Sequence, residues 1–397
     1  WRKCGINPLS PQAGTWIYDR ANWCPGSIVQ PDDYDIAIKK GSTHRVAIKM
    51  EPYINQKHPT AHYALSTYLF YCKAPWARND VSLEEIMAPS DADEYSRMNP
   101  VCGNPRILVR NSGRNPVTTM TVRYGCPGMK EPRYAWQGNI ASQQTGVIEL
   151  PGAISGCEHG RQFSVTLDSP NGRKDDYTDD NTGTSVVYLP PVYGTDFILA
   201  LRSNNDSSHN AYAITDLNGA VIRERTLGSL RANTIYYDTL NLAPGCYKLL
   251  VRDTAGDGLD FWANPEGGYG YVRLLDMNQR LLKAFTSDFG SETAYWFSVA
   301  KDAKPALAGD QLPIVNPFPL RNKGVFTLDL FLNDSTTVNV RIVTEDSSRT
   351  VFQKDCPVGR ELFLPIDITA EPDGVYYVKA TIGEKTISRR IRVRRTN

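Results

Sequence analysis

Hydrophobic and polar residues alternate along much of the chain, which is the pattern of strands with one buried face. The clearest alternating runs are Arg106–Arg110, Thr118–Tyr124, Val147–Leu150, Phe163–Leu167, Val325–Phe331, Thr337–Val343 and Gly374–Ala380. We expect the segment Asn111–Pro116 to join the first two runs as a hairpin connection. Repeated short strands of this kind build sandwiches, so the pattern predicts an all-β fold of tandem antiparallel β-sandwiches.

Helical periodicity is almost absent, and the best candidate for a helix is Val81–Met98. Ser82 and Glu85 have the spacing of a capping box, and two apolar residues follow them. Pro89 would end this helix within about two turns, because proline cannot continue the helical hydrogen bonds. We therefore expect one short helix in an otherwise β chain.

Turn-rich or proline-bearing segments divide the chain at three joints. These joints are Ala88–Asp93 with the following Asn99 and Pro100, then Leu189–Val192, and then Ala300–Pro313. The two adjacent prolines of the second joint cannot continue a central strand. A length of 397 residues suits several domains. We expect four β modules, at residues 1–95, 96–190, 191–303 and 311–397.

Charge and hydropathy argue against two kinds of partner. The chain has 44 Lys and Arg against 43 Asp and Glu, which gives a formal net charge of +1. It therefore lacks the general positive field that would hold nucleic acid, and we expect no nucleic acid among its partners. No apolar run approaches the roughly 20 residues that are needed to cross a bilayer.

The chain has 8 cysteines, and none of them forms a C-x-x-C pair, so the spacing of zinc ribbons and thioredoxin-like motifs is missing. An even number of cysteines in turn-rich β sequence indicates disulfides formed in an oxidising compartment. The alternative is a set of buried free thiols in a cytosolic protein. Local spacing favours the pairs Cys72–Cys102 and Cys126–Cys157, although sequence alone does not fix the connectivity.

The segment Asp253–Asp260 is the best candidate for a binding site. Asp253 and Asp257 occupy the first and fifth positions of an oxygen-rich calcium loop, and Gly258 occupies the sixth. The third and twelfth positions lack the usual carboxylates. We expect Ca²⁺ as the cofactor, with Asp253, Asp257 and Asp260 as its ligands. The alternative is a glycine-rich turn in which the aspartates accept hydrogen bonds from backbone amides.

Two other polar patterns are weaker candidates. His58 and His62 are four residues apart, but Pro59 between them rules out the helix that would place both on one zinc. The acidic run 175–180 holds four aspartates that repel one another unless a cation or solvent screens them. We expect this run to be a solvated loop. No Ser–His–Asp arrangement can be argued from the sequence, and we name no catalytic residue.

The N-terminal stretch carries specific motifs. Cys4–Trp16 and Tyr18–Gly26, together with His62–Tyr71, resemble the later part of the second domain of peptide-N-glycosidase F. The resemblance covers roughly residues 1–75. It implies that residues 1–95 are the C-terminal part of a jelly roll, and that Cys4 and Cys24 form a disulfide.

This resemblance also bears on activity. The catalytic carboxylates of that family lie upstream of the matched motifs, so no residue of this chain inherits a catalytic role. Half a jelly roll exposes its core and its edges. We therefore expect an upstream polypeptide, as a partner, to complete the jelly roll of residues 1–95.

The other modules have resemblances of their own. Residues 98–190 resemble an adhesin-type sandwich, and residues 191–300 resemble a β module of secreted Bacteroidetes proteins. Asn316–Phe318, Gly374–Lys379 and a final basic strand that begins at Lys385 resemble, in that order, the sorting domain of type IX secretion. This likeness implies an immunoglobulin-like fold and export across an outer membrane. The expected sorting or docking residues are Gly374, Tyr376, Lys379, Arg389 and Arg390.

The basic strand also has a simpler interpretation, in which its charges only keep a solvated edge strand from aggregating. The sequence as a whole predicts a secreted binding or scaffold protein at the bacterial cell surface, associated with the outer membrane. Its expected partners are secretion or outer-membrane proteins, and a glycan or glycoprotein. The alternative function is an amidase that releases N-glycans, with its catalytic residues upstream of this chain.

Overall fold

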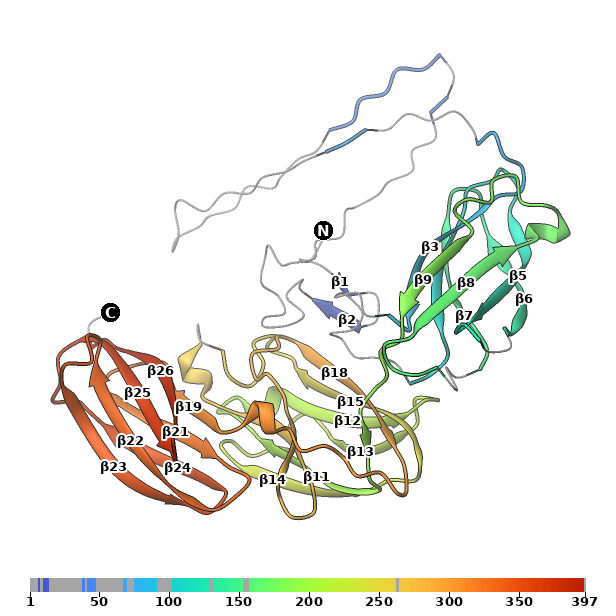
Figure 1. Ribbon diagram of the computed structural model, residues 1–397. Coiled ribbons are helices and arrows are strands. Elements are labelled where there is room, and N and C mark those ends of the chain that lie inside the picture. Colours follow the sequence, from blue (N-terminus) through green and yellow to red (C-terminus); the bar gives the residue numbers. More distant parts are fainter. Residues whose placement is uncertain are drawn as a thin grey trace.

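The computed structural model of the protein describes residues 6–7, 10–13, 38–39, 41–47, 67–69, 75–90, 102–128, 131–152, 157–261 and 264–395. These residues form strands and short 3₁₀ turns without an α-helix, which confirms the predicted all-β fold. A short antiparallel pair, β1 (Ile6–Asn7) and β2 (Ser10–Ala13), precedes three sandwiches (Figure 1). Within the described ranges, no helix is long and apolar enough to cross a membrane.

The first sandwich packs a sheet of order β3-β4-β7 against a sheet of order β6-β5-β8-β9. Its strands are β3 (Val81–Ala88), β4 (Arg106–Asn111), β5 (Val117–Gly125), β6 (Arg133–Ile140), β7 (Thr145–Glu149), β8 (Gln162–Asp168) and β9 (Thr182–Val186). Inward-facing residues such as Val109, Val122 and Phe163 meet in one core. The alternation in the sequence therefore predicted β4, β5, β7 and β8 correctly.

The predicted helix that begins at Val81 is wrong, because this segment is strand β3 and pairs antiparallel with β4. The register of this pair shifts between Leu83 and Glu85, and again between Ile86 and Ala88. Such bulges break the period of two that identifies a strand, and the remaining spacing imitates a helix. Since β3 belongs to the first sandwich, this sandwich begins before residue 96, where we expected its boundary.

The segment Asn111–Pro116 is not a hairpin, because β4 and β5 belong to opposite sheets. It crosses from one sheet to the other, and Asn111 supports the crossing from the core, where it is fully buried. The Asn111 side-chain amide donates to the carbonyl oxygens of Asn115 at 2.9 Å and of Ile140 at 2.8 Å. Backbone acceptors that the crossing would leave unpaired are satisfied in this way.

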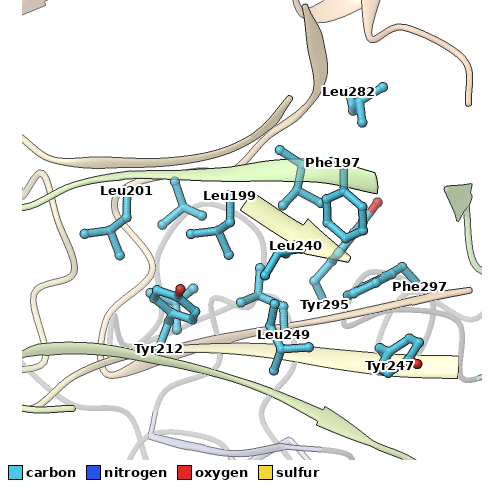
Figure 2. Close-up of a cluster of buried hydrophobic side chains, with 14 of the residues drawn as sticks. Phe197, Leu199, Leu201, Tyr212, Leu240, Tyr247, Leu249, Leu282, Tyr295 and Phe297 are labelled. Atoms are coloured by element: carbon cyan, nitrogen blue, oxygen red, sulfur yellow. The ribbon is translucent and has the colours of Figure 1, made fainter. Parts of the chain in front are cut away.

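The middle sandwich packs a sheet of order β10-β18-β15-β12-β13 against a sheet of order β14-β11-β16-β17. Its strands are β10 (Val192–Tyr193), β11 (Asp196–Arg202), β12 (Asn210–Asp216), β13 (Val221–Arg225), β14 (Ile235–Asn241), β15 (Gly245–Asp253), β16 (Tyr271–Leu275), β17 (Leu281–Ala284) and β18 (Glu292–Val299). Figure 2 shows Leu199 and Leu201 of β11 above Leu249 and Phe297 of the facing sheet.

The C-terminal sandwich packs a sheet of order β19-β21-β24 against a sheet of order β20-β26-β25-β22-β23. Its strands are β19 (Ile314–Phe318), β20 (Arg321–Asn322), β21 (Val325–Phe331), β22 (Thr336–Thr344), β23 (Thr350–Val358), β24 (Glu361–Asp367), β25 (Gly374–Ile382) and β26 (Lys385–Val393). The runs predicted from alternation coincide with β21, β22 and β25, and the basic run beginning at Lys385 is β26.

Strands β11 and β16 are buried on both faces. Leu199 and Leu274 face the core of the middle sandwich, whereas Ala200 and Leu275 belong to a second apolar cluster on the opposite face. That second cluster includes Phe331 of β21 and packs against residues of β19 and β24. The middle and C-terminal sandwiches therefore share an apolar junction.

Candidate functional site

The predicted calcium loop begins where β15 ends, at Asp253, which is 1% exposed. Its Oδ2 accepts hydrogen bonds from the backbone N of Asp257 at 2.9 Å and of Gly258 at 3.0 Å. Its Oδ1 accepts from Nδ2 of Asn210, on the neighbouring strand β12, at 3.2 Å. Gly258 has a φ of 73°, and a Cβ there would lie 2.4 Å from the carbonyl oxygen of Ser287, so this turn requires glycine.

The three predicted calcium ligands lie in two different places. The Asp257 carboxylate lies near that of Asp253, and its Oδ2 accepts from Nδ2 of Asn264 at 2.7 Å. The Asp260 carboxylate lies instead near the side chain of Asn316, on β19 of the C-terminal sandwich. The structure thus brings together Asp253 and Asp257 and leaves Asp260 at the junction.

Burial raises the pKa of two of these carboxyl groups. The pKa of Asp253 is raised to about 6, mainly by desolvation, and the neighbouring Asp257 carboxylate adds to the effect. The pKa of Asp260 is also raised to about 6, by desolvation and then by the charge of Asp288. In the part of the chain that the structure describes, no three His, Cys, Asp or Glu side chains are grouped as metal ligands. Calcium binding stays a prediction.

Two asparagines beside this loop were not candidates from the sequence. Asn204 donates through Nδ2 to the carbonyl oxygen of Gly258 at 3.4 Å, across 54 residues of chain. Asn210 is 43 residues before Asp253, its partner. The pairing of β12 with β15 brings Asn210 to the loop, and no local spacing could have indicated it.

The acidic run 175–180 in the first sandwich is only partly solvated, which corrects our expectation. Asp175 is 4% exposed, and its Oδ2 accepts from the backbone N of Val81 at 3.2 Å. Asp80, 6% exposed, lies against it, and desolvation together with the Asp175 carboxylate raises the pKa of Asp80 to about 7. Asp176 is exposed as predicted. The sequence does not reveal this burial, because Asp80, which lies against Asp175, is distant from the run in the sequence.

The junction between the middle and C-terminal sandwiches holds a buried ion network. Arg273 of β16, whose side chain is 2% exposed, donates from Nη2 to Oδ2 of Asp329 at 2.5 Å. It also donates from Nη1 to Oε1 of Glu361 at 2.5 Å. The hydroxyl of Tyr269 donates to Asp329 at 2.7 Å, and that of Tyr271 donates to Glu361 at 3.1 Å. Each carboxylate thus has one guanidinium donor and one phenol donor.

Aromatic rings surround this network. The ring of Tyr269 stacks on that of Phe318 with their centroids 4.3 Å apart. The guanidinium carbon of Arg202 lies 5.1 Å from the ring centroid of Phe363. Asn316 and Phe318, the ends of the predicted sorting motif, therefore both contact the middle sandwich.

Two disulfides lie within the described residues. Cys126 pairs with Cys157 inside the first sandwich, as local spacing predicted. Cys102, however, pairs with Cys246 of β15, so the predicted pair Cys72–Cys102 is wrong. The bond joins the segment that leads into β4 to the middle sandwich, a partnership that only the tertiary fold creates. Among the described cysteines, Cys356 is free and buried.

Several predicted residues fall outside the described ranges. They are Cys4 and Cys24 of the expected disulfide, and His58 and His62. The expected pairing of Cys4 with Cys24 stays a prediction.

The five predicted sorting residues have different surroundings. Gly374 begins β25 opposite Val393. Tyr376 is 3% exposed and donates through its hydroxyl to the carbonyl oxygen of Pro372 at 2.7 Å, so it is part of the core. Lys379 is half-buried, and its Nζ donates to Oγ of Ser347 at 3.2 Å.

The two arginines of β26 are exposed and differ in the face from which they extend. Arg389 is paired with the buried Val378, so it lies on the inner face of its strand, and its Nε donates to the carbonyl oxygen of Val315 at 3.0 Å. Arg390 is paired with Tyr377 on the outer face. An inward charge on an edge strand is a known device against edge-to-edge pairing, so Arg389 fits the simpler interpretation of the basic strand.

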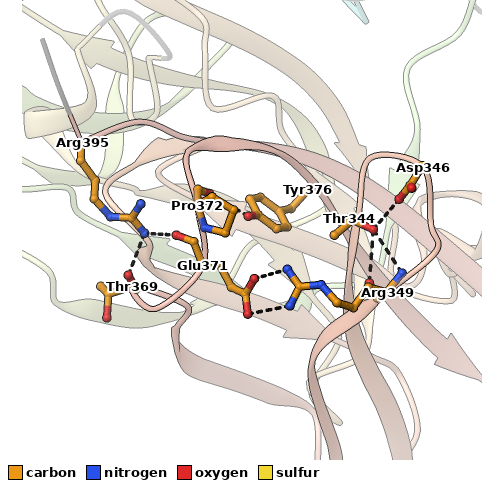
Figure 3. Close-up of polar contacts among 8 residues, drawn as sticks. All are labelled: Thr344, Asp346, Arg349, Thr369, Glu371, Pro372, Tyr376 and Arg395. Carbon is orange, nitrogen blue, oxygen red and sulfur yellow. Dashed lines mark hydrogen bonds and ion pairs between the residues drawn. The ribbon is translucent and has the colours of Figure 1, made fainter.

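The C-terminal arginine Arg395 is tied to a neighbouring loop (Figure 3). Its Nη1 forms an ion pair with Asp373 at 2.8 Å, and its Nη2 donates to the carbonyl oxygen of Thr369 at 2.8 Å. In the same loop, Glu371 pairs with the guanidinium of Arg349. These contacts neutralise part of the basic terminus, which leaves the outer face of β25 and β26 as its basic surface.

A comparison with known protein families gives a match for the N-terminal segment. Residues 2–70 match the family described as peptide-N-glycosidase F, C terminal, in agreement with the motifs. This match covers well under half of the 397 residues. A comparison with curated proteins found no match.

Solved structures that resemble the chain share little sequence with it. The 272–376 domain of a cell surface protein from Methanosarcina acetivorans is 13% identical, with 28% of this chain and 90% of that chain covered and a TM-score of 0.22. The BSP domain of a biofilm associated protein is 8% identical, with 73% and 63% covered and a TM-score of 0.23. The SGBP-B protein of Bacteroides ovatus, solved with a mixed-linkage heptasaccharide, is 12% identical, with 80% and 71% covered and a TM-score of 0.21.

Proposed function

We propose that this chain is a secreted scaffold or binding protein of the cell surface, in which the sandwiches hold the glycosidase-F-like segment in a fixed place. The observation that carries this proposal is that both connections between sandwiches are fixed. The disulfide Cys102–Cys246 joins the first sandwich to the middle one, and the network around Arg273 joins the middle sandwich to the C-terminal one.

Most contacts between domains of one chain are polar and permit motion. This junction is apolar and encloses a guanidinium that is paired with two carboxylates, so separation of the sandwiches would leave Arg273 to be resolvated and its apolar surroundings exposed. Disulfides persist in oxidising compartments, which supports a location outside the cytosol. A fixed spacing of modules suits a protein that presents a binding segment away from the cell.

We also propose export by type IX secretion and docking to outer-membrane proteins through the outer face of β25 and β26. Side chains alternate between the two faces of a strand. Because Tyr376 and Val378 are buried, their neighbour Lys379 lies on the outer face together with Arg390 and Arg392. This basic face adjoins an edge, since β20 covers β26 only beside Arg392 and Val393.

The test replaces Lys379 and Arg390 by glutamate in the full-length protein, and outer-membrane proteins that co-purify are then identified. The matched control replaces Arg133 and Arg161, which are exposed arginines of the first sandwich. We expect the first variant to lose its membrane partners and the control to keep them. Unchanged co-purification with both variants would reject the docking face.

The match of residues 2–70 favours a second function, release of N-glycans by catalytic residues upstream of this chain. In that case the sandwiches position the glycoprotein substrate for the amidase. The test is release of N-glycans from a denatured glycoprotein by the full-length protein. No release would reject the amidase, and release would make the scaffold a part of an enzyme.

A further inference from the structure

Three buried side-chain oxygens beside the loop of β15 have no hydrogen-bond donor. They are Oδ1 of Asn204, Oδ1 of Asn210 and Oδ1 of Asp257. Asn204 is 3% exposed and Asn210 is fully buried. A buried polar atom without a partner is costly, so a group of them calls for an explanation.

All three atoms belong to residues that contact one short segment, Asp253–Gly258. Asn204 donates to the carbonyl oxygen of Gly258, and Asn210 donates to the Asp253 carboxylate. Asp257 is itself part of the segment. Half a turn of either amide exchanges its nitrogen for its oxygen without moving other atoms, so both can direct oxygen to the loop.

The negative charge of the two aspartates also lacks a positive partner among the described residues. Asp253 and Asp257 lie together in one turn, where two carboxylates repel each other unless a proton or a cation screens them. Within the described residues, no Lys or Arg forms an ion pair with either of them. The group therefore combines two acids, two amide oxygens and no cation of its own.

We infer that this group is a Ca²⁺ site, with ligand oxygens from Asp253, Asp257, Asn204 and Asn210. Calcium takes carboxylate and amide oxygens in flexible numbers, with waters completing the shell, whereas magnesium requires a near-ideal octahedron. This ligand set replaces the one expected from loop spacing, because Asp260 faces Asn316 instead. The site is independent of the docking face and would exist without it.

The first experiment uses the full-length protein freed of metal by a chelator. Calcium chloride is titrated by calorimetry, and thermal unfolding is recorded with calcium, with magnesium and with chelator. We expect calcium to bind and to raise the unfolding temperature, and magnesium to do so less. Identical unfolding in calcium and in chelator, or an equal response to magnesium, would overturn the assignment.

Variants then locate the calcium. Asp257→Asn should weaken calcium binding by at least about tenfold, since it removes one of two ligand charges. The matched control is Asp216→Asn, because Asp216 accepts backbone amides of Asn218 and Ala220 in a similar turn of the same sandwich. The control should bind calcium like the wild type. Wild-type affinity in Asp257→Asn would place the calcium elsewhere and reject this site.

A third variant tests whether Asn204 is a calcium ligand or has a structural role alone. Asn204→Asp keeps the shape of the side chain and adds a charge, so it should tighten calcium binding and lower the unfolding temperature in chelator. A structural asparagine would give only the second effect. If Asn204→Asp loses stability without a gain in calcium affinity, Asn204 is not a ligand and the proposed set is wrong.

Discussion

Asp329→Ala tests whether the middle and C-terminal sandwiches fold onto each other as one unit. Asp329 is fully buried, and its Oδ2 accepts hydrogen bonds from both Arg273 and Tyr269. The alanine leaves the buried guanidinium with Glu361 alone and deprives the Tyr269 hydroxyl of its acceptor. Breaking a buried ion pair by removal of one partner costs about 3–5 kcal/mol, and the contact retained with Glu361 places the expected loss at the lower end of that range.

The assay is urea unfolding of the full-length protein followed by circular dichroism. Because the two sandwiches share the junction, we expect the loss in the transition that unfolds both. The control is Glu371→Ala, which breaks an ion pair with Arg349 whose side chains are 54% (Arg349) and 18% (Glu371) exposed. Exposed pairs contribute about 0–1 kcal/mol, so this control should remain near the wild type.

A loss for Asp329→Ala no larger than that for Glu371→Ala would refute this reasoning, because it would mean that water reaches Arg273. A triple variant, with Arg273 replaced by methionine and both Asp329 and Glu361 replaced by leucine, adds a second check, because it leaves none of the three charges without its partner. Apolar substitutes for a buried ion pair or triad are often neutral or stabilising. We therefore expect the triple variant to be more stable than Asp329→Ala, and equal instability of the two would contradict this prediction.

Two further predictions concern the first sandwich. Because the folded pKa of Asp80, about 7, exceeds its ordinary value of 3.8, the folded state binds the proton more tightly, and this stabilisation is lost as the pH rises through the folded pKa. In chelator, the unfolding temperature of this sandwich should fall between about pH 4 and about pH 7 in the wild type but less in Asp80→Asn, and equal slopes would exclude this role. Cys102→Ser should increase the radius of gyration in X-ray scattering, since it frees the first sandwich from the middle one. The control Cys126→Ser should lower stability without that increase, and an unchanged radius for both would show that other contacts hold the sandwiches together.

The strands that sequence predicted best are those with one face on a core and one in solvent. The run Phe163–Leu167 is an example, since it is predicted as a strand and lies within β8, whose buried residues alternate with half-buried or exposed ones. The bulged β3 was missed, because two register shifts removed the alternation on which the prediction depends. β11 and β16 carry nearly continuous apolar residues, since the C-terminal sandwich covers their second face. Such a run cannot be distinguished from other buried segments by periodicity alone.

The residues of the candidate site also fall into two groups. Local sequence spacing indicates one group, and only the tertiary fold brings the other group near. Asp253 and Asp257 were found because a turn holds them four residues apart, which is a spacing that sequence displays. Asn204 reaches the loop from the connection that follows β11, and Asn210 reaches it from β12; asparagine is too common in turns to mark a ligand by itself. Asp260 was included because it is near in sequence, yet the chain has by then turned toward β19. Loop spacing therefore identifies the two acids of the proposed calcium site, while the tertiary fold decides which amide oxygens lie beside them.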